Sequence, residues 1–161
     1  MPTAGTYWGI LVSFAVALIL TMMPLPGWGA HFRPEWAALT LIYWIIALPR
    51  QVGIGVAWTV GLLVDVVKGA LLGQYALGFA LTAYLCIRLH ERLRVFPVWQ
   101  QAMMAAALLV PYLVWILWSN GISGQPVDSW LFWGPLISSA ALWPWVFVLL
   151  RDVRRRTVGA Q

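Results

Sequence analysis

The stretch from residue 61 to residue 77 places one acid, Asp65, and one base, Lys68, among apolar residues. An intramembrane aspartyl protease needs two carboxylates that share one site, but this stretch holds only one, Asp65. A serine hydrolase needs a serine activated by a histidine. Both histidines, His31 and His90, fall in connections between apolar segments. The residue types that could do chemistry therefore do not predict an enzyme.

Other motifs that would indicate chemistry are also missing from the sequence. It has no Gly-x-Ser-x-Gly, no phosphate-binding Gly-x-x-x-x-Gly-Lys-Ser/Thr and no histidine, cysteine and carboxylate residues at metal-ligand spacing. We therefore expect no catalytic residue, no metal site and no cofactor. Nucleic acid is a poor candidate partner, because the sequence has no basic face interleaved with aromatic residues. The single cysteine, Cys86, excludes an intrachain disulfide.

Asp65 has three interpretations. An acid at the middle of a bilayer costs about 2.5–3.5 kcal/mol on insertion scales, so such a residue is a candidate for function. At the end of a helix, Asp65 could instead pair with Lys68, three residues later, at a much lower cost. It could also contact a helix of a partner protein, or line a pocket for a small ligand.

Small residues recur around this acid at steps of four, which place them on nearly the same face of a helix. The series is Gly53, Ala57, Gly61, Asp65, Gly69 and Gly73. Small residues let helix backbones approach closely in lipid. The series therefore predicts tight packing, either against another helix of the same chain or against a partner.

The composition predicts a single membrane domain that covers residues 1–161. Of these residues, 62% are hydrophobic and only 9% are charged, and the mean hydropathy is +0.83. Soluble domains have about 25% charged residues. We therefore expect an all-α integral membrane protein in contact with the lipid bilayer. Six transmembrane helices are predicted, at approximately residues 7–23, 34–48, 52–67, 71–87, 99–118 and 131–150.

The distribution of basic residues predicts the orientation of these six segments. With the amino terminus inside, the outer connections hold only Arg33 and Lys68. The inner connections then hold Arg50, Arg88, Arg92, Arg94, Arg151, Arg154, Arg155 and Arg156. Because basic loops stay in the cytoplasm, both termini are predicted to be cytoplasmic. The basic tail is interpreted as an anchor that faces anionic lipid, or as a contact for a cytoplasmic partner.

Several short segments, taken together in their order and spacing, resemble the rod shape-determining protein MreD family in its proteobacterial form. The first is Phe-Arg-Pro-Glu-Trp at 32–36, and the second runs from Tyr43 and Trp44 to Leu48 and Pro49. The third consists of Gly61, Leu62, Asp65, Gly69, Leu72, Gly73, Ala76 and Leu77. The last two are Trp-Gln-Gln-Ala at 99–102 and Leu-Trp-Pro-Trp-Val-Phe at 142–147. The basic tail completes the match, which covers nearly the whole chain.

The resemblance implies an inner-membrane component of the elongasome, the machinery for lateral cell-wall synthesis in rod-shaped bacteria. Such proteins associate with the bitopic protein MreC, and through it with MreB and with RodA and its penicillin-binding protein. The family also resembles, in fold, the substrate-binding subunits of energy-coupling-factor transporters. The positions that match the family pattern, and are therefore candidates for a partner interface, are Arg33, Pro34, Gly61, Asp65, Gly69 and Gly73.

Two functions of different classes follow. The first is a non-enzymatic membrane scaffold for peptidoglycan elongation and rod shape, which the resemblance and the lack of catalytic groups favour. The second is a solute-binding membrane subunit of a transporter, which the similarity in fold permits. A transporter subunit needs an enclosed pocket lined by convergent polar groups. Arg33, Pro34 and Glu35 are interpreted as a helix start, or as a charged rim that another subunit contacts.

Overall fold

The computed structural model describes residues 2–125, 127 and 130–159, and these ranges are largely helical. The elements are α1 (Ala4–Met22), α2 (Gly27–Ala30), α3 (Trp36–Ala47), α4 (Ile54–Lys68), α5 (Gln74–Val95), α6 (Val98–Ile122), the 3-10 turn η1 (Trp130–Trp133) and α7 (Gly134–Val158). No strand occurs among the described residues. The prediction of an all-α protein is therefore confirmed for this part of the chain.

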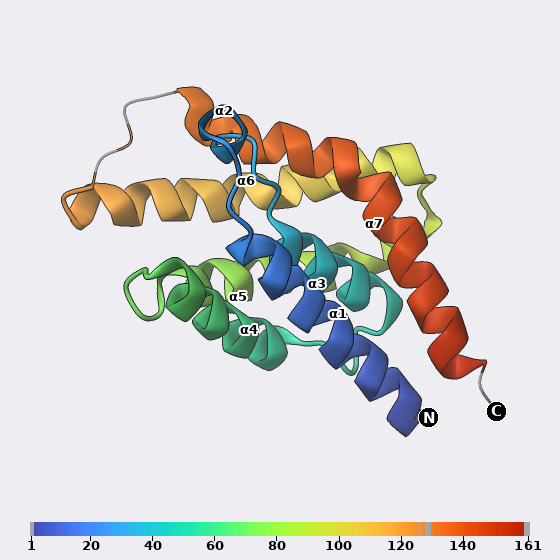
Figure 1. The fold of residues 1–161 in the computed structure, drawn as a ribbon. Coiled ribbons are helices and arrows are strands. Elements are labelled where there is room, and N and C mark those ends of the chain that lie inside the picture. Colours follow the sequence, from blue (N-terminus) through green and yellow to red (C-terminus); the bar gives the residue numbers. More distant parts are fainter. Residues whose placement is uncertain (1, 126, 128–129, 160–161) are drawn as a thin grey trace.

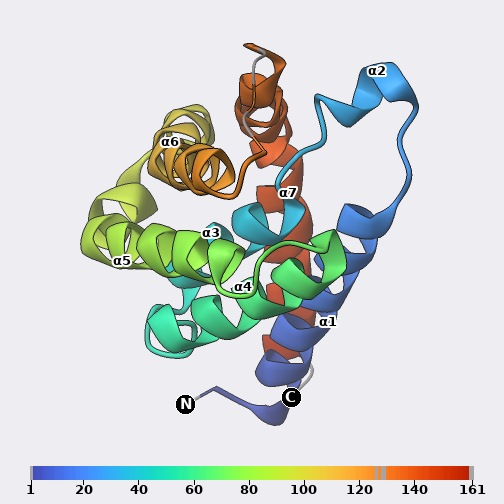
Figure 2. The same cartoon turned by 90° about the vertical axis from the view of Figure 1, so that its left-hand side faces the viewer.

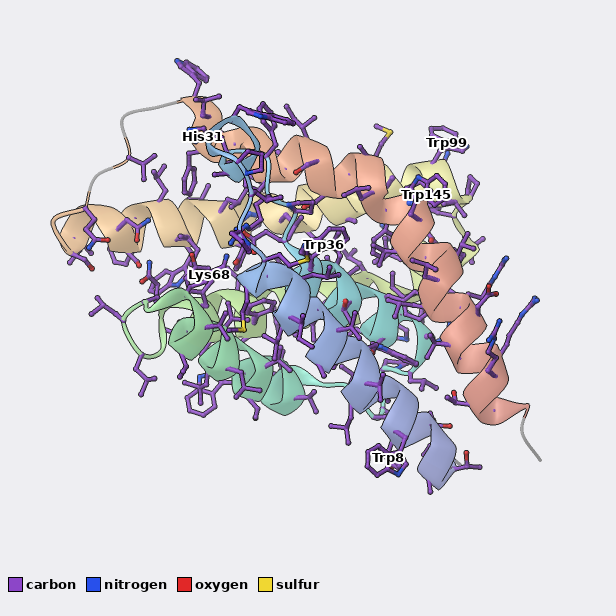
Figure 3. All side chains as sticks on the ribbon, in the orientation of Figure 1. Trp8, His31, Trp36, Lys68, Trp99 and Trp145 are labelled. Carbon is purple, nitrogen blue, oxygen red and sulfur yellow. The ribbon has the colours of Figure 1, made fainter. Side chains whose placement is uncertain are left out.

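The six long helices run back and forth through the molecule (Figure 1). Both chain termini lie at one end, together with the α3–α4 and α5–α6 connections, and we call this the terminal end. The α4–α5 turn and the end of α6 lie at the opposite end. Figure 3 places Lys68 and His31 toward that end, which we call the Lys68 end, and Trp8 toward the terminal end.

Helix α3 forms the centre of the bundle. It packs against α1, α4, α5, α6 and α7, and the rotated view in Figure 2 shows it between α4 and α5 on one side and α1 and α7 on the other. Every residue from Ala37 to Ile46 is buried, as expected for a helix that is apolar on all sides. The buried indole N–H of Trp44 donates to Ser13 Oγ at 2.7 Å.

Three helices of the described residues are long and apolar enough to cross a membrane: Ala4–Met22, Val98–Ile122 and Trp130–Val158. Helix α3 is apolar but has only 12 residues, which correspond to about 18 Å at 1.5 Å per residue. The hydrocarbon core of a bilayer is about 30 Å thick. The crossing of all six segments therefore stays a prediction.

Two connections predicted from the sequence are helical in the structure. The polar residues 88–94 continue α5 to Val95, and the basic tail continues α7 to Val158. Arginine and glutamate are good helix formers, and Pro97 is the first residue after α5 that cannot continue a helix. The predicted loop 119–130 begins later than expected, because α6 extends to Ile122. Its residues 126, 128 and 129 lie outside the described residues.

Helices α4 and α5 form the most closely packed pair, and Gly61 makes this packing possible. A Cβ atom on Gly61 would overlap the Cα of Ala76 and lie 2.8 Å from its backbone nitrogen. At Gly61, the face of small residues therefore packs against a helix of the same chain, which is one of the two alternatives given by the sequence.

The close approach at Gly61 predicts the effect of two matched substitutions in α4. Gly61→Ala should destabilise the protein by about 1–3 kcal/mol, because the methyl group has no space and the neighbouring atoms are backbone. Gly55→Ala, where nothing lies within 4 Å of the added Cβ, should be neutral or stabilise the helix by up to about 1 kcal/mol. Thermal unfolding in detergent, followed by circular dichroism, measures both. Equal stability of the two variants would contradict the packing of α4 on α5.

Candidate functional site

The turn between α4 and α5 begins with a glycine-dependent helix end. Gly69 follows Lys68 with φ +62°, and the N–H of Ala70 donates to the backbone carbonyl of Asp65 at 2.9 Å. This pattern satisfies carbonyl groups that the last turn of a helix leaves without a partner. Gly73 then begins α5 with φ +98°. Both conformations favour glycine over residues with a side chain.

These glycines correct one sequence prediction. The face of small residues does not continue past Lys68, because the helix ends there and Gly69 and Gly73 lie in the turn. Nothing lies within 4 Å of a Cβ built on either residue. These two glycines are needed because the turn requires a positive φ at each position, and not because two helices approach closely there. A Gly73→Leu substitution would therefore strain the turn itself, whether or not a partner binds there.

Asp65 uses its side chain to begin the next helix. Its Oδ1 accepts a hydrogen bond from the N–H of Tyr75 at 2.7 Å, and its Oδ2 accepts one from the N–H of Gly73 at 2.8 Å. The residue is completely buried. The first amide groups of a helix have no partner within the helix, and glycine offers no side chain to cap them. A carboxylate from the preceding helix therefore supplies the cap.

Lys68 does not pair with Asp65, so this interpretation from the sequence is wrong. Its Nζ lies 3.3 Å from both carboxylate oxygens of Glu35. This is the only ion pair among the described residues. Lys68 Nζ also lies 4.5 Å from the centre of the Tyr75 ring, and the Tyr112 hydroxyl donates to Glu35 Oε2 at 3.1 Å. The carboxylate of Asp65 instead accepts the two backbone hydrogen bonds described above.

Arg33, Pro34 and Glu35 lie in the connection from α2 to α3, beside this ion pair. The guanidinium of Arg33 donates to the carbonyl oxygens of Thr21, at 2.8 Å, and Met23. The N–H of Glu35 donates to Ser139 Oγ on α7 at 3.1 Å. Helix α3 begins at Trp36, two residues after the predicted start at Pro34, and the Glu35 side chain does not cap the helix. It turns toward Lys68 instead.

A second set of contacts joins α5 to α6. Gln74 Nε2 donates to Asn120 Oδ1 at 2.7 Å, and the indole N–H of Trp115 donates to the carbonyl of Gln74 at 2.8 Å. Sequence reasoning did not connect Glu35 with Tyr112 or Gln74 with Asn120, since the partners are 77 and 46 residues apart. The only feature of the sequence that indicated such pairs was the presence of polar side chains within apolar segments.

We call Glu35, Asp65, Lys68, Tyr75 and Tyr112 the polar network. It joins residues of α3, α4, α5 and α6 near the Lys68 end, and Figure 3 shows Lys68 there. A hollow of about 610 Å³ lies beside it, lined by Arg33, Glu35, Lys68 and Tyr75 among others. The charged groups of this lining already bond to one another or to backbone carbonyls. The described residues contain no group of three metal-binding side chains. The contacts seen here hold helices together.

The surface of the bundle defines the class of protein. Large apolar side chains are exposed along α1, including Trp8 at 67%, Leu11 at 61% and Ile19 at 60%. Such a surface indicates contact with lipid or another protein. Together with the three membrane-capable helices, it defines an all-helical membrane protein whose helices are joined by buried polar contacts.

The comparisons with known proteins identify the family. The family model described as rod shape-determining protein MreD matches residues 4–153, so the chain belongs to the MreD family. The rod shape-determining protein MreD of Haemophilus influenzae is 29% identical over 152 residues, which are 91% of this chain and 91% of that protein. No solved structure gives a significant match. The chain is thus a member of a family of rod shape-determining membrane proteins.

The capping role of Asp65 predicts a large loss of stability in Asp65→Ala. Two buried N–H groups would lose their acceptor, at about 1–3 kcal/mol for each. The control is Asp152→Ala, which removes an exposed carboxylate on α7 and should change stability by less than about 0.5 kcal/mol. Chemical unfolding in detergent micelles compares them. Asp65→Ala as stable as the control would show that the carboxylate does not cap α5.

The ion pair predicts coupling between Glu35 and Lys68. Lys68→Met leaves a mostly buried carboxylate without its cation, since the Glu35 side chain is only 12% exposed. The loss should be about 1–3 kcal/mol, because neither side chain of the pair is completely buried. Adding Glu35→Gln to Lys68→Met should recover part of this loss, since the amide keeps an acceptor for Tyr112. A double-mutant cycle measured by unfolding should give a coupling of about 1–2 kcal/mol. Additive effects would contradict a direct interaction.

Proposed function

We propose that this protein is a non-enzymatic scaffold of the elongasome in the bacterial inner membrane, required for lateral peptidoglycan synthesis and rod shape. The match of residues 4–153 to the MreD family carries this proposal. The contacts at the Lys68 end support it, because the charged side chains there hold helices in position. A solute-binding transporter subunit is less well supported, since the charged groups beside the large hollow are already bonded to the protein.

In this proposal the six long helices all cross the membrane and both termini are cytoplasmic. Their alternating direction in the bundle supports an even number of crossings (Figure 1). The arginines near the chain end and in the α5–α6 hairpin gather at the terminal end, which favours a cytoplasmic position for that end. Exposed tryptophans near both ends, Trp28 at 81% and Trp99 at 63%, suit the two headgroup regions.

We propose that MreC binds beside the α4–α5 turn, and that MreC links the chain indirectly to MreB and to RodA with its penicillin-binding protein. Of the six candidate interface residues, Pro34, Gly61 and Asp65 are buried and Gly69 is exposed. The buried residues would shape this interface without touching the partner. The exposed apolar residues beside them, Leu72 at 77% and Val66 at 70%, are suited to contact a single membrane helix.

Site-specific photocrosslinking in cells tests this partner and its position. A photoreactive amino acid at Leu72 should capture MreC. The matched control is Leu149 on α7, which is also apolar and 63% exposed but lies on a helix that does not pack against α4. The photoreactive amino acid at Leu149 should capture at least about tenfold less MreC than the one at Leu72. A tenfold ratio corresponds to a difference of about 1.4 kcal/mol in the free energy of contact.

Normal growth and rod shape of both tagged strains would show that the variants insert and function. Capture of MreC at Leu149 but not at Leu72 would contradict the proposed interface. If neither position captured MreC while the cells kept their rod shape, direct binding through α4 and α5 would be wrong.

A further inference from the structure

A hollow of about 340 Å³ lies at the terminal end, lined by residues near the ends of α3, α5 and α7 and the start of α6, away from the polar network at the Lys68 end. Its lining residues come from four helices and are Tyr43, Ile46, Ala47, Arg94, Gln101, Phe147 and Arg154. The hollow lies at the end of α3, which stops at Ala47, beside Arg94 near the end of α5 and Arg154 in the last turns of α7. It belongs neither to the candidate site above nor to the proposed MreC interface.

Two buried polar groups in this lining have no hydrogen-bond partner. Tyr43 is only 2% exposed and Gln101 only 4% exposed, yet the Tyr43 hydroxyl and Gln101 Oε1 are both without a partner in the structure. Gln101 Nε2 donates to the carbonyl of Leu93 at 2.8 Å, which fixes the orientation of its amide group. Buried polar groups normally have hydrogen-bond partners, so an unpaired group of this kind indicates a site for a polar ligand or water.

The charge of the lining is positive. Arg94 donates from Nη2 to the carbonyl of Ile46 at 2.9 Å, and its fork of five donors retains further N–H groups. No carboxylate of the described residues forms an ion pair with Arg94 or Arg154. A third guanidinium, that of Arg151, lies 5.9 Å from the Phe147 ring in the same wall. The nearest acid in sequence, Asp152, is exposed.

We propose that this hollow binds the phosphate of an anionic phospholipid headgroup, with Arg94 and Arg154 as the charged donors and the Tyr43 hydroxyl as the neutral donor. Arginine forks suit phosphate geometry, and basic pockets between membrane helices on the cytoplasmic side bind anionic headgroups. Gln101 Oε1 accepts a hydrogen bond from a hydroxyl group of a glycerol headgroup. The two guanidinium groups disfavour a headgroup that carries an ammonium ion.

The surroundings indicate a lipid as the source of the phosphate. Trp8, Trp99 and Trp145 project from the surface on the side of the terminal end (Figure 3), with 67%, 63% and 70% of their surface exposed. Exposed indole rings mark the headgroup level of a bilayer. Leu149, on the same helix as Phe147 and Arg154, is 63% exposed, so α7 also offers apolar surface to acyl chains. The proposal rests on membrane insertion of the chain and is independent of MreC.

Native mass spectrometry of the purified full chain tests the proposal, with phosphatidylglycerol or phosphatidylcholine added to the micelles. Arg154→Gln should retain about tenfold less phosphatidylglycerol, since it loses a charge-assisted hydrogen bond to the phosphate. Tyr43→Phe removes a hydroxyl that the fold does not use and should reduce retention by about threefold to tenfold. Phosphatidylcholine should be retained weakly by every variant.

Two matched controls separate the hollow from the general charge of the surface. Arg156→Gln removes the same charge from an exposed position on the same helix, and Tyr7→Phe removes a hydroxyl from a half-exposed tyrosine on α1. Both should stay within about twofold of the unmodified protein, as expected for exposed groups. Equal losses in Arg154→Gln and Arg156→Gln would overturn the site, because they would show only general attraction to anionic lipid.

A last arm adds millimolar inorganic phosphate, once together with phosphatidylglycerol and once alone. If phosphatidylglycerol stays bound in the presence of millimolar phosphate, the result supports a lipid ligand. Saturable phosphate binding that depends on Arg154, without selective retention of phosphatidylglycerol, would overturn the assignment to a lipid. Unchanged thermal unfolding of Tyr43→Phe without lipid shows that a loss of retention does not come from misfolding.

Discussion

A helix that begins inside a membrane protein exposes amide groups that water does not reach, and these groups need acceptors from the protein. In this chain Asp65 supplies them for α5, through its bonds to the N–H groups of Gly73 and Tyr75. Its backbone carbonyl also closes the end of α4. One buried carboxylate therefore fixes how α5 leaves the turn. Gly61, one turn earlier in α4, allows the two helix backbones to touch below it.

The remaining charges of the Lys68 end extend this arrangement to the other helices. Glu35 brings the start of α3 to Lys68 and to Tyr112 on α6, while its backbone N–H reaches α7. A rigid α4–α5 turn then presents exposed leucines to its surroundings, which suits a protein that binds neighbours. At the terminal end, the arginines of the described part of the chain form no ion pair, and Arg94 and Arg154 line a hollow beside the end of α3. The two ends thus use their charges differently.

The sequence predicted the helical class, the positions of the apolar segments and the family, because composition, periodicity and motif order are local properties. It also identified Asp65 as unusual. It could not assign the partner of Asp65, since periodicity treats residues 61–73 as one helix and does not reveal that the helix ends at Lys68. The Glu35–Lys68 pair was missed because its members are 33 residues apart. Long-range pairs depend on how helices pack, and a single sequence contains little information about that.

Hydrogen exchange at the α4–α5 turn tests the role of Asp65 most directly. We expect the amides of residues 73–77 to be protected in the intact protein, although they border a turn. In Asp65→Ala their exchange should accelerate by at least about tenfold, which corresponds to about 1.4 kcal/mol, while α6 keeps its protection. Fast exchange of these amides in the intact protein, or identical exchange in both proteins, would contradict the proposal that one carboxylate positions the start of α5.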